Sequence, residues 1–239
     1  MTGVFVLFIL GGLTLVIGLG ILGYLADKRR REAMQALATA RGWTYTERDD
    51  RWTDRFPGSP FGLGHNRQAK NILTGRYDDR PFVAFDYVYY TTETRTDSEG
   101  HTHTEEQSHS YSIVAVDLGA AFPELEVTPE GFFSRMIGRL TDRDIELESE
   151  DFNRAFTVTC PDRKFAFDVL HPRMMEYLLG HTDEAFRFAG GHLLVAAAGQ
   201  AGLPEIDAAL AFVDGIADRI PEFVWRAVGL PAPRPGAAS

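Results

Sequence analysis

The chain has 239 residues, with 24 Lys and Arg against 34 Asp and Glu, which gives a net charge of −10. With 44% hydrophobic and 24% charged residues, it has the composition of a folded protein and not of a disordered or collagen-like one. One cysteine excludes a disulfide scaffold and a cysteine-based zinc finger. The acidic balance argues against a nucleic-acid partner.

Residues 4–26 form a run without a charged side chain, VFVLFILGGLTLVIGLGILGYLA. As a helix this run would reach roughly 35 Å, enough to cross a hydrocarbon core of about 30 Å. The alternatives are a buried core helix and a cleaved signal peptide. The run is too long for a signal peptide and lacks its basic n-region and its cleavage site. We expect a transmembrane helix at 4–26 in contact with the lipid bilayer, preceded by a short external terminus at 1–3.

Basic residues follow the apolar run almost at once, at Lys28, Arg29, Arg30 and Arg31, and none precedes it. The positive-inside rule then places the amino terminus outside and the rest of the chain in the cytoplasm, as a single-pass protein of the cell membrane. We expect the four basic residues to contact anionic headgroups at the membrane surface. They begin a basic helical stalk over 27–42 that ends at a glycine.

Small residues at Gly11, Thr14 and Gly18 lie on one face of the expected membrane helix. They would allow two copies of the helix to approach closely and form a homo-oligomer. The alternative is that they simply face lipid.

Residues 43–230 are predicted to form a cytoplasmic α+β domain with a mainly antiparallel sheet. Strand-like segments at 69–77 and 82–92 flank a turn and indicate a hairpin. A segment apolar on both faces, 111–118, is typical of a central strand. Further strands are expected at 43–46, 124–128, 155–160, 165–170, 185–188 and 192–198. Helices are expected at 132–140, 172–179 and 203–228, the last with a long apolar face and a break at Pro221, and a disordered tail at 231–239.

Two stretches of the domain resemble each other. DRPFVAFD at 79–86 and DRKFAFD at 162–168 both read as hairpin turns. Either the domain consists of two related halves, about 43–128 and 129–230, or the two hairpins converged on similar turn residues.

Segment 145–179 carries the pattern L-E-x-x-x-F-x-x-x-F-x-V, a later Asp, and L-x-P-x-M-M-x-x-L, and 186–199 reads FRFAGGHLLVAAAG. With the apolar segment and its basic stop, this pattern resembles an uncharacterised bacterial family of membrane-anchored proteins that are often found beside LemA-type proteins. The resemblance is best over the second half of the chain, and the family often has more spans. It implies membrane anchoring but no catalytic residues.

Histidines are the first candidates for chemistry. His101, His103 and His109 lie in the loop 99–109 (EGHTHTEEQSH), where imidazoles beside glutamates suit a metal ion. Their spacing matches no structural zinc site, and a solvated acidic loop is the alternative. No metal or cofactor is therefore assigned, and the three histidines are kept as candidates only.

Nucleophilic and phosphate-binding motifs give no catalytic residue. Cys160 and His171 form a conceivable Cys–His pair, but a structural thiol is the alternative that we favour. Asp86 and Asp117 interrupt apolar strands, and each either ends a buried face or pairs with an arginine.

The function that follows is a membrane-tethered cytoplasmic protein-interaction or scaffold module without catalytic activity. Its partner is expected to be an unidentified membrane or cytoplasmic protein. The alternatives are a ligand- or metal-responsive sensor that uses the loop 99–109, and an enzyme of unrecognised type.

Overall fold

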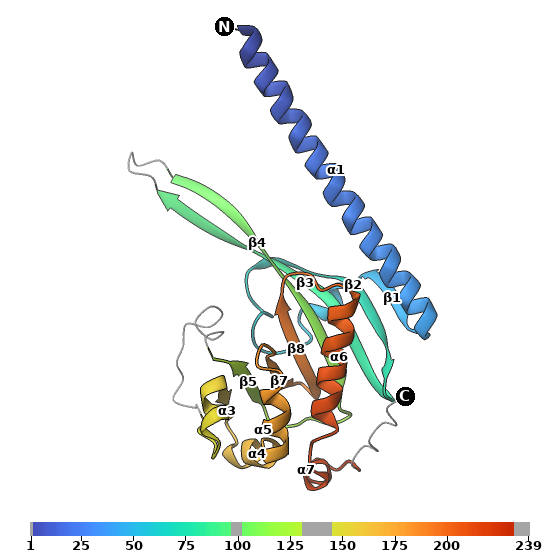
Figure 1. Ribbon diagram of the computed structural model, residues 1–239, viewed down its shortest axis with the longest axis vertical. Coiled ribbons are helices and arrows are strands. Elements are labelled where there is room, and N and C mark those ends of the chain that lie inside the picture. Colours follow the sequence, from blue (N-terminus) through green and yellow to red (C-terminus); the bar gives the residue numbers. More distant parts are fainter. Residues whose placement is uncertain (1, 97–101, 131–144, 232–239) are drawn as a thin grey trace.

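A single eight-stranded antiparallel sheet forms the centre of the protein (Figure 1). The computed structural model describes residues 2–96, 102–130 and 145–231. Along the sheet the strands follow the order β1-β2-β3-β4-β8-β7-β5-β6. Their bounds are β1 Thr44–Arg48, β2 His65–Tyr77, β3 Arg80–Thr96, β4 Thr102–Asp117, β5 Leu125–Pro129, β6 Phe156–Thr159, β7 Phe186–Ala189 and β8 His192–Ala198. The expected α+β class with an antiparallel sheet is therefore confirmed.

One long helix and several short ones accompany the sheet. They are α1 Thr2–Arg41, the 3-10 turn η1 Asp50–Trp52, α3 Glu150–Ala155, α4 Arg163–Val169, α5 Pro172–Leu179, α6 Leu203–Ala217 and α7 Glu222–Ala227. Pro221 stands between α6 and α7, which confirms the predicted break in the last helix. Proline interrupts a helix because it has no N–H to donate to the next hydrogen bond of the helix.

The prediction of a transmembrane helix at 4–26 is wrong. In the part of the chain that the structure describes, no helix combines the length and the hydropathy that crossing a bilayer requires. Three further predictions depended on that helix and are wrong with it: the single-pass topology, the placement of the two ends on opposite sides of a membrane, and the location in the cell membrane. The uncharged run predicted a helix correctly, since 2–41 is one continuous helix, but helicity alone does not make a span.

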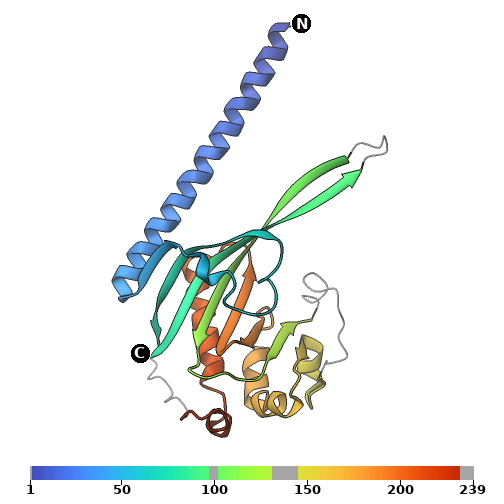
Figure 2. The same cartoon turned by 180° about the vertical axis from the view of Figure 1, so that it is seen from behind.

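The last turns of α1 are part of the domain and not a free stalk. Met34 and Ala38 are 1% and 2% exposed and belong to the same core as the sheet. The helix ends beside Gly42, whose φ of +67° is the left-handed conformation that terminates helices. Beyond this docked end, the rest of α1 projects well clear of the body (Figure 1 and Figure 2).

Alternation along the central strands creates two cores, one on each face of the sheet. In β3, Phe82 and Ala84 face the core that contains α1 and α6, whereas Val83, Phe85 and Tyr87 face the other. The second core is closed by aromatic side chains of the 50–64 segment, Trp52, Phe56 and Phe61. β4 alternates in the same way between its neighbours β3 and β8, which confirms the predicted central strand.

A charged residue lies in the middle of this apolar centre. Asp86 on β3 is 2% exposed, and Arg30 of α1 reaches it with a bidentate ion pair at 2.5 and 2.9 Å. Asn71 of β2 donates to the same carboxylate at 2.7 Å, and Arg30 also donates to the Ala201 carbonyl at 2.7 Å. Of the two alternatives left open for Asp86 by the sequence, the structure shows the pairing with an arginine. The pair joins α1, two strands and the segment before α6.

Most expected strands and helices are present, with two clear errors. Over its described residues 102–109, the loop expected at 99–109 is part of strand β4. The hairpins β2–β3 and β7–β8, strand β5 and helix α5 lie where the sequence predicts them. Segment 165–170, expected as a strand, is instead within helix α4, because Asp162 accepts a hydrogen bond from the Phe165 amide and caps the helix.

The two similar stretches 79–86 and 162–168 consequently have different structures, a β-turn entering a strand and a helix start. The division into two related halves stays a prediction, although one sheet runs through both. The helix expected at 132–140 and the tail beyond 231 lie outside the described residues.

The buried ion pair makes a direct prediction. Asp86→Ala leaves the guanidinium of Arg30 without its carboxylate at a buried position, and the expected loss is about 3–5 kcal/mol of unfolding free energy. Glu47→Ala removes the exposed partner of Arg31 at 2.7 Å and should cost less than about 1 kcal/mol. Urea unfolding followed by tryptophan fluorescence measures both. Similar small losses in the two variants would show that the pair does not hold α1 on the sheet.

Candidate functional site

A two-stranded ribbon extends from the sheet at one end of β3 and β4. β2 pairs with β3 only as far as Tyr90, and β8 pairs with β4 only as far as Tyr111. Beyond these points the two strands continue to pair with each other up to Thr96 and Thr102. At about 3.4 Å per residue the ribbon reaches about 20 Å past the body. It leaves the body on the same side as the free part of α1 (Figure 1 and Figure 2).

Two of the three histidines proposed as metal ligands, His103 and His109, lie on this ribbon and do not converge. His103 and His109 are both on β4, six residues apart, which places them about 20 Å from each other along the strand. His109 stacks on Tyr89 with ring centroids 4.7 Å apart, and its Nε2 lies 2.8 Å from the Thr91 hydroxyl. Ligands of one metal ion must all lie within about 2 Å of it, so these two cannot share one. His101 lies outside the described residues.

Three of the four basic residues expected at a membrane surface make contacts within the protein. Arg30 pairs with Asp86 as described, and Arg31 lies 2.7 Å from Glu47 and 3.4 Å from Asp27. Lys28 lies 3.8 Å from Glu32 on the next turn. Arg29 is exposed. This stretch therefore contributes to the attachment of α1.

Three carboxylates gather where the β2–β3 turn meets α6. One oxygen from each of Asp78, Asp214 and Asp218 lies within 4.8 Å of the others. Arg80, 8% exposed, lies among them, in contact with Asp214 and 2.6 Å from Asp218. Because a guanidinium already supplies the positive charge, the cluster is an ion-pair network that fixes the turn to α6. Burial raises the pKa of Asp214 to about 6, against the opposing effect of Arg80.

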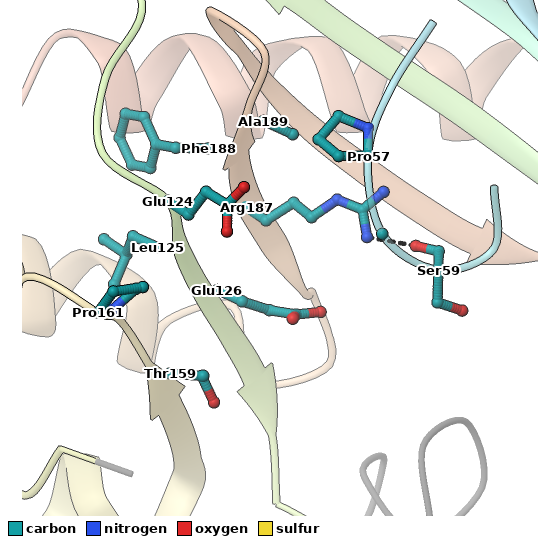
Figure 3. A pocket seen from close by; sticks show the side chains of 11 residues that line it. Pro57, Ser59, Glu124, Leu125, Glu126, Thr159, Pro161, Arg187, Phe188 and Ala189 are labelled. Carbon is teal, nitrogen blue, oxygen red and sulfur yellow. Dashed lines mark hydrogen bonds between the residues drawn. The ribbon is translucent and has the colours of Figure 1, made fainter. Parts of the chain in front are cut away.

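A cavity of about 240 Å³ opens beside β7, between the 57–59 segment and strands β5 and β6 (Figure 3). Arg187 extends into it from the middle of β7 and is 9% exposed. Gly58 faces the guanidinium with φ +78°, and a Cβ there would lie 3.1 Å from Nη1, so glycine leaves the space that the arginine uses. The remaining lining residues are Pro57, Ser59, Glu124, Leu125, Glu126, Thr159, Pro161, Phe188 and Ala189.

The electrostatics of Arg187 are unusual among the described residues. Its Nη1 donates to the Ser59 carbonyl, and its guanidinium carbon lies 5.8 Å from the centre of the Phe61 ring. Burial lowers the pKa of Arg187, and the fields of Glu126 and Glu124 only partly oppose this effect. A buried charge of this kind is held by its surroundings at an energetic cost.

Other candidate residues have structural roles. The Cys160 thiol is buried and contacts the carbonyl oxygens of Glu124 at 3.1 Å and Asp162 at 3.0 Å. Burial raises the pKa of Cys160, which disfavours a thiolate nucleophile. His171 lies 2.9 Å from the Arg219 carbonyl, and Asp117 accepts from the Gly119 amide at 2.8 Å.

Arg187 is the residue that sequence reasoning missed. Its signal was an arginine between two phenylalanines in the strand-like run FRFA, where a charge interrupts an apolar pattern. The same type of signal identified Asp86.

The architecture is an α+β fold with one antiparallel sheet, helices on one face, a docked amino-terminal helix and a projecting ribbon. No family model and no curated protein matches the chain. Among solved structures, it is similar to the crystal structure of the mycobacterial trehalose monomycolate transport factor A, TtfA. The TM-score is 0.55 at 13% sequence identity, covering 86% of this chain and 98% of that chain. This likeness shows a shared fold. The LemA-associated family resemblance stays a prediction.

The pKa of Asp214 predicts a pH dependence of stability. Since the folded-state pKa of about 6 lies above the usual 3.8, the folded state binds more protons than the unfolded state between these values. Stability contributed by this group therefore falls as the pH rises from about 4 to about 6. Because Asp214 is partly solvated, the expected change is about 1–2 kcal/mol relative to Asp214→Asn, which cannot titrate. Urea unfolding of both proteins across this range tests it, and parallel curves would contradict it.

Proposed function

We propose that this chain is a non-catalytic accessory protein that acts as a protein-interaction module through the β3–β4 ribbon. The ribbon is the single observation that carries the proposal. Within the described residues, the only strand neighbour that each ribbon strand has beyond Tyr90 and Tyr111 is the other. Strand edges of this kind add an extended segment of another protein by backbone hydrogen bonding.

The sequence of the ribbon favours such an addition. Segments 91–96 and 102–110 contain neither proline nor lysine, the residues that natural proteins use to block exposed edges. They are rich in threonine, which suits strands. The same segments carry three Glu and one Arg, so an extended segment with basic residues fits better than a second copy of this ribbon.

The fold similarity supports an accessory role in a limited way. The protein that shares the fold is named a transport factor, and we extend to this chain only the accessory, non-catalytic character of such a role. The positions of His103 and His109 give no support to the sensor alternative, because these two side chains are too far apart to share a metal ion.

A ribbon-shortened variant provides the test. Thr91 and Gln107 are cross-strand partners, so replacing 92–106 by Asn-Gly closes the hairpin with a two-residue turn. The body should keep its melting temperature, because neither core contains a residue from the deleted part.

The binding measurement uses a photo-crosslinking amino acid at Thr94, at Thr104 or, as a control, at the exposed Glu176 of α5. In the host cell, Thr94 and Thr104 should give the same adduct and Glu176 none. A synthetic peptide of the crosslinked segment should bind the full chain and bind the shortened variant at least about tenfold more weakly, since the strand it pairs with is removed. Equal peptide binding by both proteins would reject the proposal.

A further inference from the structure

A groove lies at the end of the molecule opposite the ribbon, where helices α4, α5 and α7 lie together (Figure 1 and Figure 2). Its main part has a volume of about 880 Å³ and is lined by residues of α4 and α5 and by the junction of α6 with α7. A smaller part of about 210 Å³ continues along α7. Asp168 and Phe223 line both parts, so the two parts form one continuous surface.

Two phenylalanine side chains of this groove are exposed. Phe167 of α4 is 42% exposed and Phe223 of α7 is 52% exposed, and no other phenylalanine whose accessibility the structure describes is as open to solvent. Ile220 and Pro221 add further apolar surface between the two helices. Exposed aromatic side chains that gather on a concave surface are typical of places where another molecule docks, because covering them removes apolar area from water.

The carboxylates that line the main part of the groove are already paired within the protein. Asp168 lies 2.5 Å from Lys164, one turn earlier on α4. Asp218, just after α6, lies 2.6 Å from Arg80 of the ion-pair network at the β2–β3 turn. Both carboxylates are therefore engaged by cations other than the arginines of the groove.

Two arginines of the groove, by contrast, have no carboxylate partner. The guanidinium of Arg219 lies 3.9 Å from the centre of the Tyr177 ring, and its Nη1 donates to the Gly215 carbonyl at 2.7 Å. Arg173 lies one turn before Tyr177 on α5, so the two cations occupy neighbouring positions. No ion pair joins either arginine to a carboxylate of the described residues. This rim of the groove therefore attracts negative charge, on a chain whose net charge is −10.

The walls of the groove decide the form of the partner. None of the lining residues belongs to a strand, so these walls offer no strand edge with which an extended segment could form hydrogen bonds. A helix satisfies its own backbone groups and presents only side chains to its surroundings. An amphipathic helix can therefore place apolar residues on the groove and acidic residues at its rim.

We propose that this groove is a docking site for an amphipathic helix of a partner protein that carries acidic residues beside its apolar face. The apolar residues of that helix pack on Phe167 and Phe223, and its carboxylates pair with Arg173 and Arg219. The groove and the ribbon lie at opposite ends of the body and share no residue, so this inference does not depend on the proposed strand addition.

The experiment titrates the full chain into two fluorescein-labelled peptides at low salt and follows the fluorescence anisotropy. Both peptides are alanine-based helices with leucines at i, i+3, i+4 and i+7, and they carry either glutamates or lysines beside the leucines. We expect saturable binding of the glutamate peptide, at least about tenfold tighter than binding of the lysine peptide. The difference should shrink as salt is added, because the salt screens the exposed charges.

Two variants and two matched controls locate the binding site. Phe223→Ala should weaken binding of the glutamate peptide at least about tenfold, as expected for a central aromatic contact. Arg173→Glu should weaken binding of the glutamate peptide and strengthen binding of the lysine peptide, which loss of packing alone would not do. Leu63→Ala removes an apolar side chain that is 43% exposed outside the groove, and Glu176→Gln changes a charge on α5 that does not line it. Neither control should change the affinities.

All four side chains are exposed, so the variants should keep the melting temperature of the unmodified protein. Absence of saturable binding of the glutamate peptide would reject the docking site. Equal affinity for the two peptides would reject the pairing with the arginines. An equal loss of affinity in Phe223→Ala and Leu63→Ala would show that the peptide binds apolar surface elsewhere, and would overturn the assignment to the groove.

Discussion

The arrangement of this protein depends on one carboxylate buried in the middle of its sheet. Asp86 lies on β3, between β2 and β4, and burial of an unpaired carboxylate there would be strongly unfavourable. The guanidinium of Arg30 neutralises it, and Asn71 completes the hydrogen bonding. Because Arg30 belongs to α1, folding of the sheet and docking of the helix are coupled. Met34 and Ala38, one and two helical turns after Arg30 on α1, then pack into the core on the same face of the sheet.

Three arginines that are mostly shielded from solvent, Arg30, Arg80 and Arg187, have different roles. Arg30 and Arg80 each meet carboxylates from another element, and each joins a helix to the sheet. Arg187 is as buried as Arg80, but among the described residues its guanidinium donates to one backbone carbonyl and to no carboxylate. The first two arginines complete the fold with groups that the chain itself provides. The third is held by the Ser59 carbonyl, and its Nε and Nη2 have no hydrogen-bond partner among the described residues.

Local patterns in the sequence predicted the secondary-structure elements better than they predicted the environment and contacts of those elements. The strand-like segments 69–77 and 82–92 correctly predicted a hairpin, and the long apolar face of 203–228 correctly predicted a packed helix. Segment 165–170 was misread because its alternating Phe-Ala-Phe also fits a capped helical turn. The apolar run at 4–26 predicted a helix but not its environment. A charge that interrupts an apolar strand, as at Asp86 and Arg187, marks a residue in the sequence, but the distant residue that it contacts, Arg30 or Ser59, has no local signature.

The continuity of α1 has a mechanical consequence. About 28 residues separate Arg30 from the first turn of the helix, which corresponds to a rigid lever of about 42 Å at 1.5 Å per residue. The helix is attached to the body at the ion pair of Arg30 with Asp86. Just after the helix ends, the indole N–H of Trp43 donates to the Arg76 carbonyl at 3.1 Å. A rotation of α1 by about 10° around this attachment point would displace its amino-terminal end by about 7 Å. Small changes where the helix meets the sheet are thereby converted into large displacements at a distant point, and the reverse holds for forces applied to that end.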